Sequence, residues 1–101
     1  MTQCCKNYLM EQFGDEDVVN EIYTEYANSI QEKLPEFDTV LAAEDWNALD
    51  RLAHAVKGNA LAAGDTPVAD VAIALRAAAK MSEKDTARSL IDQLKELAKE
   101  I

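Results

Sequence analysis

Apolar residues return every three or four positions along almost the whole chain, which is the spacing that lines one face of an α-helix. The pattern predicts a short helix over 5–13 and four longer helices over about 17–43, 46–63, 67–80 and 83–101. No stretch shows the apolar–polar alternation of a half-buried strand. The predicted fold class is therefore all-α: an antiparallel up-down-up-down four-helix bundle with a short extra N-terminal helix. Val56 and Leu94 fall on apolar faces and are expected in its core.

Short sequences that stop and start helices separate these segments. Gly14 and Gly64 can each end a helix in the left-handed conformation. The N-caps expected at the next helix starts are Asp15, Asp45, Thr66 and Ser82. Pro35 lies inside the second segment, and its missing N–H predicts a kink or a break near Leu34.

The composition supports one small domain. The 101 residues include 17 alanines against 3 glycines and 2 prolines, and we expect a single domain over 1–101 with residues 1–7 frayed. The net charge of −9 repels phosphate backbones and anionic lipids, so neither nucleic acid nor a membrane is an expected partner. No apolar run reaches the roughly 18–20 residues of a membrane span, and no signal peptide is recognisable. A monomeric, cytoplasmic protein is expected.

The only two cysteines, Cys4 and Cys5, are adjacent in the sequence. Adjacent cysteines cannot join distant segments by a disulfide, and free thiols fit a reducing compartment. We interpret them as two thiols on a frayed N-terminus. A metal site formed by the paired thiols is the alternative interpretation.

The third long helix carries the only histidine of the chain. At about 100° per residue, the apolar positions of this helix centre on one direction, and His54 lies roughly 150° away from it. The periodicity therefore predicts an exposed histidine on the solvent face of a helix.

Lys57 and Gly58 follow His54 by one turn and lie on the same side of the helix. Glycine inside a helix costs about 1 kcal/mol relative to alanine. It either allows close helix packing or leaves room beside the imidazole, and its position away from the apolar face favours the second. Lys57 is either an ordinary solvated lysine or a cation that meets an anion at the imidazole. Leu61, exposed on the same face, can begin an apolar docking patch.

These residues are the minimum parts of a phosphoryl acceptor, because neutral imidazole is a good nucleophile and phosphoryl transfer needs mainly positioning and charge stabilisation. The segment 52–64 resembles the histidine-containing phosphotransfer (HPt) domain. Its signature appears here as Ala53-His54, Lys57-Gly58 and Gly64. The resemblance extends from about Tyr8 to the C-terminus in helix order and length. The departures from the family pattern are Val56 for Leu, Asn59 for a small Ser and Asp65 for Ala.

The resemblance implies that His54 accepts a phosphoryl group from a receiver-domain aspartate and passes it to another receiver domain. Lys57 is then expected to contact the phosphoryl oxygens. The implied partners are receiver domains of response regulators or hybrid sensor kinases. The chain itself is expected to have no kinase activity and no cofactor, because the Mg²⁺ that receivers require belongs to the partner.

A receiver must lie against the third helix to reach His54. The residues expected at this docking face, beside Gly58, are Asn47, Asp50, Arg51 and Leu61. Leu61 is the expected apolar centre, with Asp50 and Arg51 at the rim. The second helix is expected to form the other wall.

Three other classes of protein share parts of this pattern. A helical metal or haem protein lacks ligands here, since the chain has one His and no Glu-x-x-His pair. An acyl carrier protein needs an attachable Ser in an Asp-Ser-Leu context, and the chain has none. A helical adaptor that docks partners without phosphate chemistry would use the same bundle face, and it stays open as the alternative function.

Overall fold

In a computed structural model, residues 1–101 form five α-helices and no strand, which confirms the all-α prediction. The helices are α1 (Gln3–Phe13), α2 (Glu16–Ala42), α3 (Trp46–Ala63), α4 (Thr66–Lys80) and α5 (Lys84–Ala98). No helix is both long enough and apolar enough to cross a membrane.

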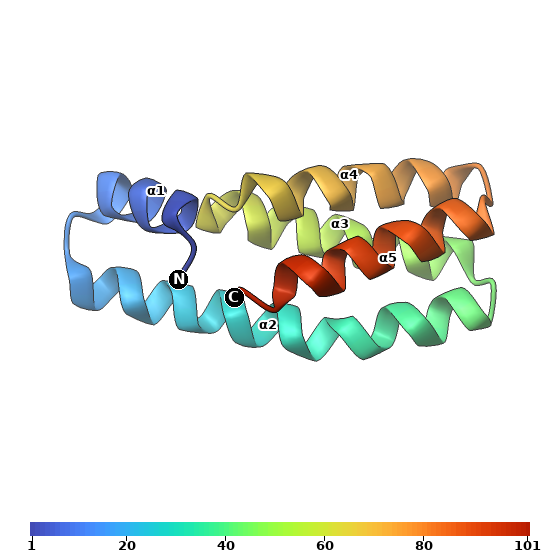
Figure 1. Cartoon of the computed structure of the whole chain (residues 1–101), viewed down its shortest axis with the longest axis horizontal. Helices are drawn as coiled ribbons and strands as arrows, with labels where there is room; N and C mark the ends of the chain where they lie inside the picture. The colour runs from blue at the N-terminus through green and yellow to red at the C-terminus, as the bar shows by residue number, and fades with distance from the viewer.

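The long helix α2 sets the length of the molecule. Its 27 residues span about 40 Å, close to the 42 Å long dimension of the chain. Figure 1 shows α3, α4 and α5 beside one part of α2, with consecutive helices running in alternating directions, and α1 beside the remaining part. Each of α2–α5 packs against two others of the four, and α1 contacts α2 and α3.

The core lies between these helices, and small residues dominate where α3 meets α4. The buried residues of α4 include Ala69, Ala72, Ala78 and Ala79. Since alanine side chains let helices approach closely, α3 packs more extensively against α4 than against any other helix. Val56 and Leu94 are fully buried, as predicted. The helix that carries His54 is therefore held firmly by its neighbour.

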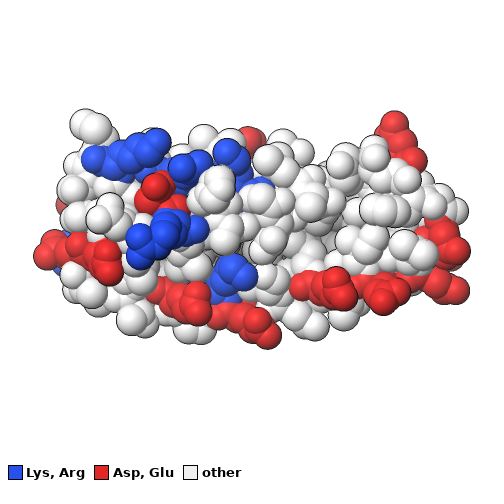
Figure 2. Space-filling view, turned by 180° about the vertical axis from the view of Figure 1, so that it is seen from behind, with Lys and Arg blue, Asp and Glu red and all other residues white.

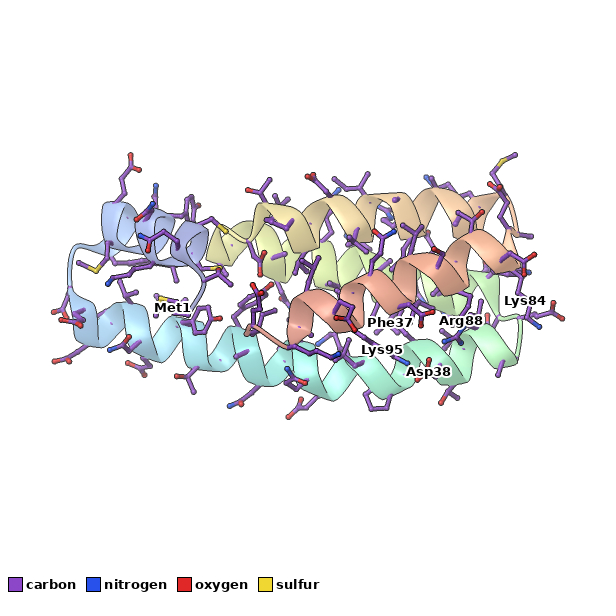
Figure 3. All side chains as sticks on the ribbon, viewed as in Figure 1. Met1, Phe37, Asp38, Lys84, Arg88 and Lys95 are labelled. Carbon is purple, nitrogen blue, oxygen red and sulfur yellow. The ribbon has the colours of Figure 1, made fainter.

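A charged cluster closes the seam between α2 and α5. Asp38 of α2 accepts hydrogen bonds from Lys95 Nζ (2.8 Å) and Arg88 Nη1 (3.0 Å) of α5. Figure 3 shows these side chains converging beside the buried ring of Phe37. The hydrogen bond from Lys95, together with that from Arg88, lowers the pKa of the Asp38 carboxyl. This cluster joins the two helices at the surface.

The N-terminus differs from the frayed segment expected over 1–7. The first helix begins at Gln3, two residues before the predicted start, and Cys5 is fully buried. Tyr8 lies so close to Gly64, at the turn after α3, that a Cβ on Gly64 would collide with its side chain. Long-range packing, which local sequence does not report, orders this segment.

Two of the predicted caps are wrong. Asp65, not Thr66, caps α4, because its Oδ1 accepts a hydrogen bond from the Val68 N–H (3.3 Å). The last helix begins at Lys84 without a side-chain cap, and Ser82 stands outside it with a φ of 53°. The caps expected at Asp15 and Asp45 are both present.

Pro35 does not break α2, which is continuous from Glu16 to Ala42. The helix bows outward near its middle in Figure 1, and Pro35 is exposed to solvent. The helix therefore continues past the one backbone hydrogen bond that the proline nitrogen cannot donate.

Candidate functional site

His54 lies near the middle of α3 and faces away from the core. Asp45 begins this helix by accepting a hydrogen bond from the Ala48 N–H (3.1 Å), and Gly64 ends it with a φ of 73°. The buried residues of α3 are Leu49, Ala53, Val56, Ala60 and Ala63. His54 falls on the opposite side and is exposed, as the periodicity predicts.

The His54 imidazole and the Lys57 ammonium have no partner within the chain. Neither takes part in a side-chain hydrogen bond or an ion pair. Lys57 is partly exposed, one turn beyond His54. Both groups are therefore available to a molecule that approaches from solvent.

Gly58 does not serve helix packing. No heavy atom lies within 4 Å of the position that a Cβ would occupy, and Gly58 is exposed. A side chain here would extend into open space next to the His54 ring. The structure thus excludes close helix packing as the reason for this glycine.

The four residues expected at a docking face divide into two kinds. Asn47, Arg51 and Leu61 are exposed on α3, and Leu61 keeps 51% of its surface. Asp50 instead accepts a hydrogen bond from Arg76 Nε of α4 (2.9 Å). Asp50 therefore links α3 to α4 and is only partly open to a partner.

A groove between α2 and α3 runs beside this face. Its volume is ≈ 510 Å³, and its lining residues are Pro35, Glu36, Thr39, Val40, Ala48, Arg51, Leu52 and Ala55. Ala55 is the next residue after His54. The second helix, α2, thus lies across the groove from this part of α3.

The charges around α3 differ from those of the rest of this acidic chain. Together α3 and α4 carry four basic and two acidic residues, whereas α2 carries seven acidic residues and one basic residue. Figure 2 views the side on which α3 lies nearest the reader. Basic side chains gather over one half of this face, and acidic ones follow its lower edge along α2. The helices α3 and α4 therefore carry a small net positive charge within a chain whose overall charge is negative.

Asn59, a departure from the family pattern, has a structural role. Its Nδ2 donates to the Ser29 hydroxyl of α2 (3.0 Å), and Lys33 Nζ donates to the same oxygen (2.8 Å). The bond from Asn59 ties α3 to α2 directly after Gly58, and the bond from Lys33 lies within α2. The amide lies on the α2 side and leaves the surface around His54 open.

One set of metal-ligating side chains comes together away from His54. The donor atoms of Cys4, Cys5 and Asp65 all lie within 4.8 Å of one another. Burial raises the pKa of the Cys5 thiol to about 11, so Cys5 is a neutral thiol near pH 7. No comparable set surrounds the histidine.

Sequence reasoning missed two residues that the fold brings to these places. Arg76 reaches the His54 side of α3 through its bond to Asp50, and nothing in its local sequence marks it. Asp65 is buried, where its Oδ2 accepts a hydrogen bond from the Tyr26 hydroxyl of α2 (2.8 Å). Its position directly after Gly64 is a signal for a helix cap that was available in the sequence.

Comparison with known proteins identifies the family. Residues 21–101 match the sequence pattern described as the Hpt domain, whereas α1 lies outside the match. No curated protein and no solved structure matches the chain. Hpt domains are phosphotransfer modules of two-component signalling that interact with receiver domains and have no kinase activity. Since the match covers well over half of the sequence, the chain belongs to the Hpt domain family.

Proposed function

We propose that His54 is the phosphoryl acceptor of this Hpt domain and that the chain relays phosphoryl groups between receiver domains. The observation that carries the proposal is the state of the imidazole: it is exposed, unpartnered and flanked by a lysine without an ion pair and by a glycine without neighbours. It is also the only imidazole in the chain.

The chemistry is an in-line displacement at phosphorus. A ring nitrogen, which we take to be Nε2 because it reaches furthest into solvent, forms an N–P bond as the P–O bond to the receiver aspartate breaks. The aspartate leaves as a carboxylate with the electron pair. The reverse displacement, by a second receiver's aspartate, regenerates the imidazole. Such a transfer needs mainly positioning and charge stabilisation from the protein.

Lys57 and Gly58 supply these two requirements. The Lys57 ammonium can stabilise the negative charge on the phosphoryl oxygens, and no carboxylate in the chain neutralises it. Gly58 leaves space through which a receiver surface approaches the ring. The Mg²⁺ of the reaction is supplied by the receiver.

The receiver docks on α3, with α2 beside it. Asn47, Arg51 and Leu61 offer exposed side chains, while Asp50 contributes at the rim through its pair with Arg76. The groove between α2 and α3 accommodates apolar side chains of the partner. Such an interface has an apolar centre and a polar rim, as transient complexes do.

The direct test is transfer from a phosphorylated receiver domain, in Mg²⁺, to this chain and to its His54→Gln variant. We expect acid-labile, alkali-stable phosphate on the wild-type chain and none on the variant. Helicity of the variant should be normal, because His54 makes no contact that the fold needs. In the same assay, Lys57→Ala should slow transfer without abolishing it. The matched control is Lys6→Ala, because Lys6 is an exposed lysine of α1 that forms no ion pair.

Phosphate that still accumulates on His54→Gln would contradict the assignment of the acceptor. Wild-type chain that binds receivers but never carries phosphate would favour the helical adaptor. Equal rates for Lys57→Ala and Lys6→Ala would make Lys57 an ordinary solvated lysine.

A further inference from the structure

A second polar cluster lies where the start of α1 meets α2 and the turn between α3 and α4. It contains the two thiols, Cys4 and Cys5, and the carboxylate of Asp65. The three donor atoms lie within 4.8 Å of one another, which is near the ligand spacing around a four-coordinate metal ion. Cys4 is exposed, whereas Cys5 and Asp65 are buried. The cluster is therefore a largely buried site with one ligand at the surface.

Asp65 is a buried carboxylate without a cationic partner. Asp65 is only 3% exposed. Its carboxylate accepts hydrogen bonds from two neutral donors, the Tyr26 hydroxyl and the Val68 N–H. No lysine or arginine pairs with it. A buried charge normally has a compensating charge or binds a metal. A cation between Asp65 and the thiols would supply that compensation.

The Tyr23 hydroxyl is an independent sign of a missing ligand. Tyr23 is 8% exposed, and its buried hydroxyl has no hydrogen-bond partner. The Tyr23 ring packs edge-on against the ring of Tyr26, with centroids 6.1 Å apart, and the Tyr26 hydroxyl donates to Asp65, so Tyr23 lies next to the cluster. A buried hydroxyl without a hydrogen-bond partner costs folding free energy. A metal-bound thiolate would be a good acceptor for it, whereas a neutral thiol is a weak one.

We propose that Cys4, Cys5 and Asp65 form a binding site for Zn²⁺ or a similar thiophilic divalent ion. Two sulfur ligands and one carboxylate oxygen suit zinc, with a fourth position left for water or another small ligand. Each thiol loses its proton to solvent as its sulfur binds the ion. Tyr26 orients the carboxylate through its hydrogen bond.

The proposed ion would join α1 to the body of the bundle without touching the phosphoryl chemistry. Asp65 follows His54 by eleven residues, or about 16 Å along the helix axis. The ion would connect the first turn of α1 to the residue that caps α4. Because Asp65 joins Cys4 and Cys5 only in the folded chain, the ion would bind that state more tightly and would raise the unfolding temperature as its free concentration exceeds its Kd.

The test uses Co²⁺ as a spectroscopic probe of the full chain with its thiols reduced. We expect one Co²⁺ per chain, near-ultraviolet thiolate-to-Co²⁺ charge transfer, and displacement by one equivalent of Zn²⁺. Cys4→Ser should weaken binding by at least about tenfold, or roughly 1.4 kcal/mol, and lose about half of the charge-transfer intensity. Because Cys4 is exposed, this variant should fold normally.

Glu11→Gln is the matched control, because Glu11 lines the same surface hollow as Cys4 but is not in the cluster. Its Co²⁺ affinity should equal that of the wild-type chain. His54→Gln should bind Co²⁺ with wild-type affinity although it cannot accept phosphate. A failure of the proposed phosphorelay can therefore be distinguished from a failure of the proposed metal site. The proposal would be overturned if Co²⁺ produced no thiolate charge-transfer band, or if Cys4→Ser bound Co²⁺ as tightly as the wild-type chain. It would also be overturned if Glu11→Gln lost as much Co²⁺ affinity as Cys4→Ser.

Discussion

Gly58 is a residue whose presence the helix itself does not favour. Six of the other residues in α3 are alanines, and glycine in such a helix costs about 1 kcal/mol relative to alanine. Close packing does not recover that free energy, because a Cβ at this position would contact nothing. The backbone conformation does not require glycine either, since the φ angle of Gly58 is not positive. In the proposed function, its use is the access that it gives to a partner approaching His54.

This reasoning predicts opposite effects of Gly58 substitutions on stability and on transfer. Gly58→Ala should raise the free energy of unfolding by about 0.5–1 kcal/mol without accelerating phosphotransfer. Gly58→Glu should keep normal helicity and strongly reduce transfer, because a long anionic side chain beside His54 obstructs and repels the phosphorylated partner. Urea unfolding and the transfer assay measure the two effects.

Ser89→Glu is the control for added charge. Ser89 is exposed on α5, which packs against α2 and α4 rather than forming the His54 face. The Ser89→Glu variant should accept and transfer phosphate at the wild-type rate. A Gly58→Glu variant as active as Ser89→Glu would leave the glycine without a role in access.

At the scale of helices, local signals succeeded where both ends of an element are set by neighbours in sequence. The predicted bounds of α3 agree with the structure, because Asp45 and Gly64 act within one turn of the helix ends. The same periodicity placed His54, Lys57 and Gly58 on one exposed face. These features depend only on backbone geometry that is common to all helices.

The features that were missed depend on contacts between distant segments. Asp65 is the cap of α4 and is also held by Tyr26, 39 residues earlier. Cys5 is buried because α1 packs against α2 and α3, whereas its sequence neighbours suggest a free end. Arg76 joins the site only through the close packing of α3 on α4. No local pattern predicts these long-range contacts, although the position of Asp65 directly after Gly64 is a local signal for the cap itself.

The Asp38 cluster predicts how the α2–α5 seam responds to acid. Its folded-state pKa lies below the ordinary 3.8 because of the hydrogen bonds from Lys95 and Arg88. The cluster therefore contributes stability above pH 3.8, and this contribution is lost as the pH falls through the lowered pKa. The side chain is 44% exposed, so the contribution is small, on the order of 0.2–1 kcal/mol per ion pair.

Asp38→Asn should accordingly unfold at lower urea concentration than the wild-type chain at pH 7, and the difference should shrink and vanish as the pH falls below the folded pKa. Asp70→Asn is the control, since Asp70 is exposed on α4 and forms no ion pair. A difference for Asp38→Asn that persists undiminished in acid would show that packing, not charge, joins the seam.

At the scale of the whole molecule, the charge is divided between faces. The chain carries a net −9, yet basic residues outnumber acidic ones on α3 and α4. In the proposed function, we expect this distribution to favour the approach of an anionic phosphoryl group to the His54 side over the acidic α2 side. Receiver association should therefore be guided electrostatically, but the affinity of the complex must come from the apolar surface that docking covers.

Leu61 is the residue on which that affinity should depend. It lies two turns beyond His54, about 10 Å along α3, and keeps 51% of its surface exposed. If a receiver covers this face, Leu61→Asp buries a charge in the apolar centre of the interface. We expect receiver binding, measured by calorimetric titration, to weaken at least about tenfold, or roughly 1.4 kcal/mol. Helicity should be unchanged, since an exposed substitution alters stability by only about 0.5 kcal/mol.

Met81→Asp makes the same chemical change at a different place. Met81 is 71% exposed and follows the last residue of α4, so a receiver seated over His54 and Leu61 should not reach it. Its receiver affinity should match the wild-type chain. Amide NMR shifts on receiver binding should cluster on α3 and the facing part of α2. Equal affinities for both variants, with shifts centred on α4 and α5, would place the docking surface on the other side of the bundle.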